Sequence, residues 1–266
     1  MRPSLFVPCV LLALAGCSRK TDDTAALAGQ VKQRLAERDT KLSGYHIAGT
    51  VKDEGQDPVP FTFDYRAPQR MRGTLGTPPT RIFSWDGTHL FEQLDGDKRF
   101  TTFKSELPPA KLAGFLTETF GVFTPEGFRA PLLSRGATLR RVKHPRAQDA
   151  VELTATLGGE AEGVALVYVL RWPGLDFLDK RSRAPDGTEA EVRMEEEHCD
   201  AALGLCVPKR LTRWLGGQRI GETVLGRVEL NSPPPNDAFT LVPPEGYDVK
   251  TRTLVEAPAE NPPTGG

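Results

Sequence analysis

The sequence predicts an α+β domain made mostly of antiparallel β-sheet. Many short segments alternate apolar with polar residues, which is the pattern of a strand with one buried face. The turn dipeptides Asp86-Gly87 and Asp95-Gly96 join neighbouring segments as hairpins. Helical spacing of apolar residues appears in two other segments, one before residue 43 and one between residues 108 and 123.

The first sixteen residues have the composition of a secretory signal. Arg2 precedes an apolar stretch from Leu5 to Leu14, which is much shorter than the roughly 20 residues that a membrane-spanning helix needs. The Leu-Ala-Gly-Cys motif that ends at Cys17 resembles the lipobox of bacterial lipoproteins. The resemblance implies cleavage before Cys17, attachment of lipid to its thiol and, with Ser18 next, an outer-membrane location. The alternative is an ordinary signal peptide with an incidental cysteine.

Three segments follow the signal peptide of residues 1–16. Residues 17–23 are polar and are expected to form a lipidated tether. One domain is expected over residues 24–252. The tail of residues 253–266 is rich in Pro and Gly and too poor in apolar groups to fold, so we expect disorder there.

The domain is expected to begin with an amphipathic helix over residues 24–42. Its apolar residues recur mostly three or four positions apart, with Lys and Arg between them. They are Leu27, Val31, Leu35 and Leu42.

Alternating segments run as a meander over residues 45–103 and resume over residues 151–230. The clearest is the strand of Phe61, Phe63 and Tyr65, whose intervening residues are polar. Between the two groups, residues 108–123 carry the apolar stripe of a helix and are rich in phenylalanine. The stripe consists of Leu112, Phe115, Leu116, Thr119 and Phe120.

Two cysteines remain for the exported domain besides Cys17. Cys199 and Cys206 are separated by six residues that resemble a hairpin tip, and in an oxidising compartment we expect them to form a disulfide. A redox Cys-x-x-Cys site does not fit this spacing, and no histidine cluster accompanies the pair as it would in a metal site. The expected role is a structural staple.

The composition argues against several classes of function. A net charge of −1 gives no support for a nucleic-acid partner. None of the common nucleotide-binding, metalloprotease or hydrolase motifs is present, so we expect neither an enzyme nor a bound cofactor or metal. The acidic run Glu195–His198 is interpreted as a solvated strand edge, and Asp176 and Asp179 as solvated residues of a turn.

Three segments together resemble the LolA/LolB-like lipoprotein-carrier superfamily. They are residues 63–68 (Phe-Asp-Tyr-Arg-Ala-Pro), residues 84–91 (Ser-Trp-Asp-Gly-Thr-His-Leu-Phe) and residues 230–249, which contain Phe-Thr-Leu-Val-Pro-Pro-Glu-Gly-Tyr-Asp-Val. The resemblance implies a curved open half-barrel of about ten or eleven strands, with helices covering its concave face. It further implies an apolar ligand between sheet and helices, and it makes Arg66 a candidate for holding the helical lid.

The resemblance gives the apolar residues two alternative roles. They line a cavity that holds the acyl chains of a lipid or lipoprotein, in a membrane-anchored protein of lipid or lipoprotein sorting. Alternatively they fill a core, and the chain is a structural or sensory envelope lipoprotein that acts through its surface on an envelope protein partner. The candidate ligand residues are Phe61, Phe63, Tyr65, Phe115, Leu116 and Phe120.

Overall fold

The computed structural model describes residues 18–67, 69–108, 111–112, 115–116, 137–156 and 163–255. The predicted signal peptide, Cys17, Phe120 and residues 256–266 of the predicted tail lie outside the described residues.

The described chain consists of one long helix, fourteen strands in one sheet, and short helical turns. In chain order the elements are α1 (Ser18–Lys41), β1 (Gly44–Asp53), β2 (Val59–Arg66), β3 (Arg70–Leu75), β4 (Arg81–Trp85), β5 (His89–Leu94), β6 (Arg99–Ser105), β7 (Thr138–His144), β8 (Ala147–Thr156), β9 (Ala165–Arg171), β10 (Phe177–Arg183), β11 (Glu189–Asp200), β12 (Leu205–Leu215), β13 (Gln218–Leu230), the 3₁₀ helix η2 (Asn236–Phe239) and β14 (Asp248–Leu254).

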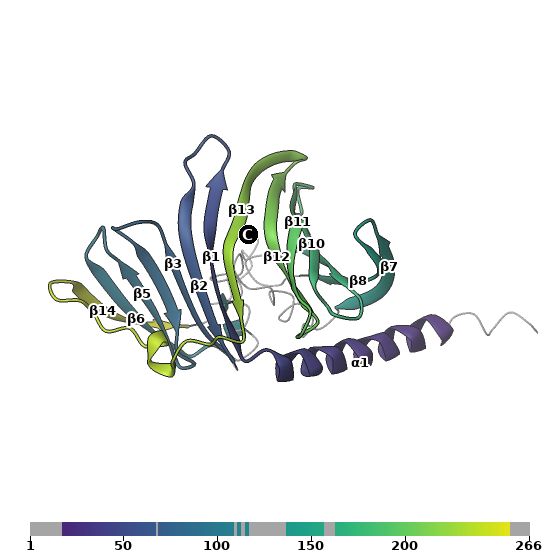
Figure 1. Ribbon diagram of the computed structural model, residues 1–266, viewed down its shortest axis with the longest axis horizontal. Coiled ribbons are helices and arrows are strands. Elements are labelled where there is room, and N and C mark those ends of the chain that lie inside the picture. The colour runs from purple at the N-terminus through teal and green to yellow at the C-terminus, as the bar shows by residue number, and fades with distance from the viewer. Residues whose placement is uncertain are drawn as a thin grey trace, which may run out of the picture.

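The sheet is built from two antiparallel meanders that meet in the middle (Figure 1). Strands β1 to β6 follow one another on one side, strands β7 to β13 on the other, and β1 pairs with β13 at the seam. The last strand, β14, pairs with β6 in the parallel direction and forms one edge, while β7 forms the other. The prediction of a mostly antiparallel, open sheet is therefore right, and the predicted number of strands is too low.

Helix α1 packs against the β7 side of the sheet through its predicted apolar stripe. Leu27, Val31 and Leu35 are buried in one cluster with Leu153 of β8 and Tyr168 of β9. The helix begins at Ser18, six residues before its predicted start, and ends at Lys41. Within the described part of the chain, no helix has the length and hydrophobicity to cross a bilayer.

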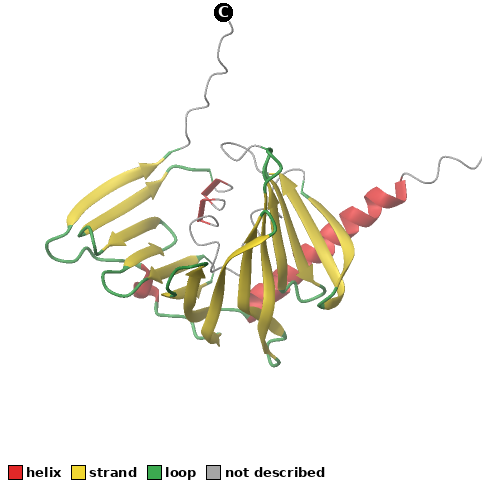
Figure 2. Cartoon of the chain, turned by 90° about the horizontal axis from the view of Figure 1, so that it is seen from above, coloured by secondary structure: helices red, strands yellow, loops and turns green. Residues whose placement is uncertain are grey.

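The sheet curves, so that its two sides turn toward each other (Figure 2). Helical turns at residues 111–112 and 115–116 lie on the inner, concave side of this curve. They are the described part of the helix predicted over residues 108–123. A complete helical cover of the concave face is thus not established by the described residues.

The segment that leads from β13 to β14 packs on the opposite, convex face. Arg66 Nη1 donates to the carbonyl of Pro234 at 2.7 Å, and Arg72 Nη1 donates to the carbonyl of Ala238 at 3.1 Å. Ser84 Oγ donates to the carbonyl of Phe239 at 2.6 Å. These bonds hold the segment against the convex face. The segment then reaches the outer edge of the sheet, where β14 pairs with β6.

Candidate apolar ligand site

The strand register arranges the predicted aromatic residues in rows across the concave face. The lower row, nearest the end of α1, contains only aliphatic, aromatic and methionine side chains and consists of Leu230, Tyr45, Tyr65, Met71, Trp85, Leu90 and Phe103. The middle row consists of Val228, Ile47, Phe63, Gly73, Phe83, Glu92 and Thr101. Phe61 and Leu75 pair in the next row up. Because side chains alternate between faces along a strand, these rows form one continuous surface.

Two segments distant in sequence pack onto this surface. Leu116 and, less deeply, Phe115 come from the predicted insertion helix. Leu205 and the partly buried Leu203 come from the cysteine hairpin between β11 and β12. The structure therefore brings five of the six predicted ligand residues into one cluster, whereas Phe120 lies outside the described residues.

The upper end of the surface, toward the β1–β2 hairpin, is less covered. Val59 pairs with Val51, and their side chains lie on the same face as Phe61 and Leu75 by register. Val59 is 40% exposed and Leu75 is 36% exposed, although Phe63 in the middle row is fully buried. The apolar surface thus continues from a buried lower end to an exposed upper end.

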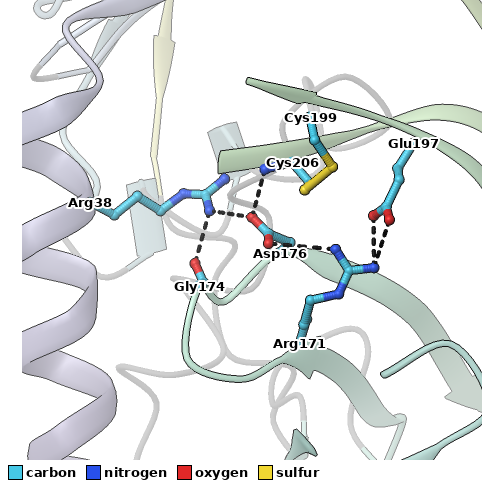
Figure 3. The surroundings of a disulfide bond; sticks show 7 residues. All are labelled: Arg38, Arg171, Gly174, Asp176, Glu197, Cys199 and Cys206. Carbon is cyan, nitrogen blue, oxygen red and sulfur yellow. Dashed lines mark hydrogen bonds and ion pairs between the residues drawn. A yellow bond between two sulfur atoms is a disulfide. The ribbon is translucent and has the colours of Figure 1, made fainter. Parts of the chain in front are cut away.

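The cysteine hairpin is fixed at the lower end by a polar network around Asp176 (Figure 3). Cys199 and Cys206 face each other across β11 and β12 and form a disulfide. The carboxylate Oδ1 of Asp176 accepts from the backbone N–H of Cys206 at 3.0 Å and from Arg38 Nη1 at 2.9 Å. Since Arg38 belongs to α1, this carboxylate connects the helix to the hairpin that carries Leu203 and Leu205.

Asp176 is a correction to the sequence interpretation, which made it a solvated turn residue. It is buried, as is Arg38, and Arg38 Nη1 also donates to the carbonyl of Gly174 at 3.0 Å. The position of Arg38 in the helix could have indicated that its side chain is buried. Arg38 lies three residues after Leu35 and four before Leu42, so it falls on the apolar stripe.

The acidic run Glu195–His198 pairs with β12 on one side only, because the register of β10 with β11 ends at Arg193, and Glu196 and His198 are exposed, as expected of a solvated strand edge. Glu196 pairs with Arg210 at 2.9 Å and Glu197 with Arg171 at 2.8 Å. Glu197 lies within 4.8 Å of both cysteine sulfurs, but disulfide sulfurs are not thiolate ligands and its carboxylate is already paired. These carboxylates therefore act as ion-pair partners, Glu196 with the neighbouring strand β12 and Glu197 with Arg171 at the end of β9.

The architecture has counterparts among solved structures, although no protein-family model and no curated protein sequence matches the chain. A LolA superfamily protein from Nitrosomonas europaea superposes with a TM-score of 0.51 at 10% identity, over 79% of this chain and 97% of its own. An outer membrane lipoprotein-sorting protein domain from Vibrio parahaemolyticus gives 0.53 at 9% identity, over 82% and 96%. The chain has the LolA-type fold. A DUF1329 family protein from Desulfovibrio piger gives 0.55 at 8% identity, over 82% and 97%.

Within the LolA-type fold, the position of Arg66 differs from the one that the sequence resemblance implied. Tyr65 faces the concave side, so Arg66, the next residue of the same strand, faces the convex side. Its guanidinium holds Pro234 on that side rather than the insertion helix. In the described residues, the cysteine hairpin on the apolar face is instead held by the hydrogen bond that the Cys206 N–H donates to Asp176.

Proposed function

We propose that this chain is an envelope lipoprotein, anchored through lipid on Cys17, that binds acyl chains of a lipid or lipoprotein on the concave face of its sheet. The observation that carries the proposal is the apolar lower row, continuous from β13 to β6, together with its extension to the exposed Val59 and Leu75. An apolar surface of this extent on a curved sheet needs a cover or a ligand.

Lipoprotein sorting is the process in which we place this binding, with the outer membrane as its site. The support comes from the LolA-type fold, since one of the matching structures is named as an outer membrane lipoprotein-sorting domain. The chemistry proposed is binding and release rather than catalysis. Lipid on one cysteine is sufficient for stable anchoring, because the cysteine carries several acyl chains. Each chain contributes about 0.8 kcal/mol for every methylene buried in the membrane.

A second candidate is a structural or sensory lipoprotein with a filled core, acting on an envelope protein partner. Its support is the burial of Tyr45, Phe61 and Phe63 under side chains of the protein itself. The two candidates differ in whether a ligand can displace Leu116 and the cysteine hairpin from the sheet.

The exposed upper end of the apolar surface allows a test that leaves the buried core intact. Val59→Lys places a charge where an acyl chain would run, and we expect the affinity for a fluorescent fatty acid to fall by about tenfold or more with the melting temperature nearly unchanged. Val249→Lys is the matched control, because Val249 is 54% exposed and pairs with Phe100 of β6, on the convex side.

Mass spectrometry of gently purified protein should in addition detect co-purified lipid. A wild-type protein that carries no lipid and does not bind the probe would refute the carrier function and favour the filled core. Equal loss of binding in both variants would place the probe elsewhere on the molecule.

A further inference from the structure

Trp85 holds a hydrogen-bond donor inside the apolar surface. Its side chain is 3% exposed, and its indole Nε1 has no acceptor among the described residues. Trp214 is different, because its Nε1 donates to Thr212 Oγ1 at 3.0 Å. Nearly all buried polar groups in proteins have a partner, so a buried donor without one indicates a missing acceptor.

The position of Trp85 connects this donor to the proposed ligand site. Trp85 lies in the lower row between Met71 and Leu90, and belongs to the same buried cluster as Leu116. Because Leu116 packs against the same cluster, an acceptor on this face of Trp85 would lie between the sheet and the segment that carries Leu116. That space is the one in which the proposed function places an acyl chain.

The apolar residues around Trp85 determine which kind of acceptor can pair with its indole N–H. An indole N–H only donates, so its partner must accept. A charged carboxylate is costly to bury among Met71, Leu90 and Leu116, whereas a neutral carbonyl oxygen has a much smaller desolvation penalty. Acyl esters and amides carry such a carbonyl at the end of a long apolar chain. The middle and upper rows lie above Trp85 and extend about 13 Å along the strand. The hydrocarbon part of the acyl group would lie over these two rows.

We propose that Trp85 Nε1 donates a hydrogen bond to the ester or amide carbonyl of the bound acyl group, so that the site selects acyl compounds over plain hydrocarbons. This inference rests on the proposed function and specifies its ligand class. The carbonyl lies at the lower row, and the hydrocarbon chain lies along the middle and upper rows toward Leu75.

Competition against a fluorescent fatty acid tests the proposal in the full-length mature protein. The competitors are methyl palmitate and an alkane of matching length. The wild type should bind the ester about two- to twelvefold more tightly than the alkane, the range expected for one net hydrogen bond. Trp85→Phe removes the donor but keeps an aromatic ring, and it should bind both competitors with the affinity that the wild type has for the alkane.

Trp172→Phe is the matched control, because Trp172 packs against the α1 cluster and should leave the preference for the ester intact. A preference that persists in Trp85→Phe would overturn the proposal, as would an equal loss of both affinities. If the wild type binds neither the competitors nor the probe, the proposed function itself fails.

A measurement on the wild type keeps the proposal testable even if Trp85→Phe unfolds. The chain has three tryptophans, and each gives one indole N–H signal in a ¹⁵N-correlated NMR spectrum. Methyl palmitate should shift the Trp85 signal downfield, and the alkane should not. A Trp85 signal that responds identically to the two compounds would refute the hydrogen bond.

Discussion

The buried ion pair between Arg38 and Asp176 gives the sharpest test of how α1 and the cysteine hairpin are held together. In Arg38→Met the carboxylate loses the Nη1 donor at 2.9 Å, and Gly174 loses the donor to its carbonyl. Asp176 keeps the Cys206 N–H at 3.0 Å and has Arg171 at 3.8 Å. Both partners of the pair are almost fully buried, with side-chain exposures of 3% and 6%.

Removing one partner of a buried pair destabilises a protein by about 3–5 kcal/mol, because the other charge remains buried. Since Asp176 retains one hydrogen bond and one nearby cation, we expect the lower end, about 3 kcal/mol. Replacing both partners by apolar residues, in Arg38→Met with Asp176→Leu, should recover part of this loss because no charge is then left uncompensated. Urea unfolding of the mature protein, followed by circular dichroism, measures all three values.

Arg34→Met is the matched control, one turn earlier in the same helix. Arg34 pairs with Glu37 at 2.7 Å, but the two side chains are 46% and 43% exposed, so the loss should be much smaller than in Arg38→Met. Equal losses in Arg34→Met and Arg38→Met would refute the reasoning, because burial would then have no influence on the strength of the pair.

Three further predictions follow from the same features. Peptide mapping without reductant should find Cys199 joined to Cys206, and replacing both by Ser should lower stability by about 2–3 kcal/mol without abolishing folding, because the closed loop is short. Cys17→Ser should abolish labelling with radioactive palmitate, and a labelled variant would refute the anchor. Hydrogen bonds, first from the Thr80 hydroxyl and then from Gln93 and Tyr247, lower the pKa of Asp95 from 3.8 to about 2. Its stabilising contribution is therefore complete above the unfolded pKa and is lost as the pH falls from 3.8 toward 2, so melting temperatures of the wild type and Asp95→Asn should converge over that range.

The periodic segments were predictable from sequence because one face of each strand is buried. The alternation of Phe61, Phe63 and Tyr65 identified β2 and the face that it presents. The two edge strands were missed for the opposite reason. β7 has four basic residues among its seven and β14 is exposed along nearly its whole length, as is common for edges that resist pairing with other chains. Neither strand carries the alternation that burial of one face imposes.

The polar contacts of the candidate site were less predictable, since they depend on strand pairing over long sequence separations. The turn around Asp176 looks solvated in sequence, because nothing nearby in the chain reveals that Arg38 will cover it. The unpaired indole N–H of Trp85 could likewise not be predicted from the sequence, because it depends on the packing of Trp85 in one cluster with Leu116. Composition showed that an apolar surface exists, and only the register showed which polar atoms lie within it.

The parallel pairing of β14 with β6 has a consequence for the order of folding. The N-terminal part of a chain is synthesised first, and hairpins from β1 to β6 need only local contacts to form. The outer edge of β6 then waits for residues 248–254, which follow it by about 150 positions. Contacts of such separation form late and slowly. During that interval β6 presents unpaired backbone groups, and these expose it to pairing with other chains.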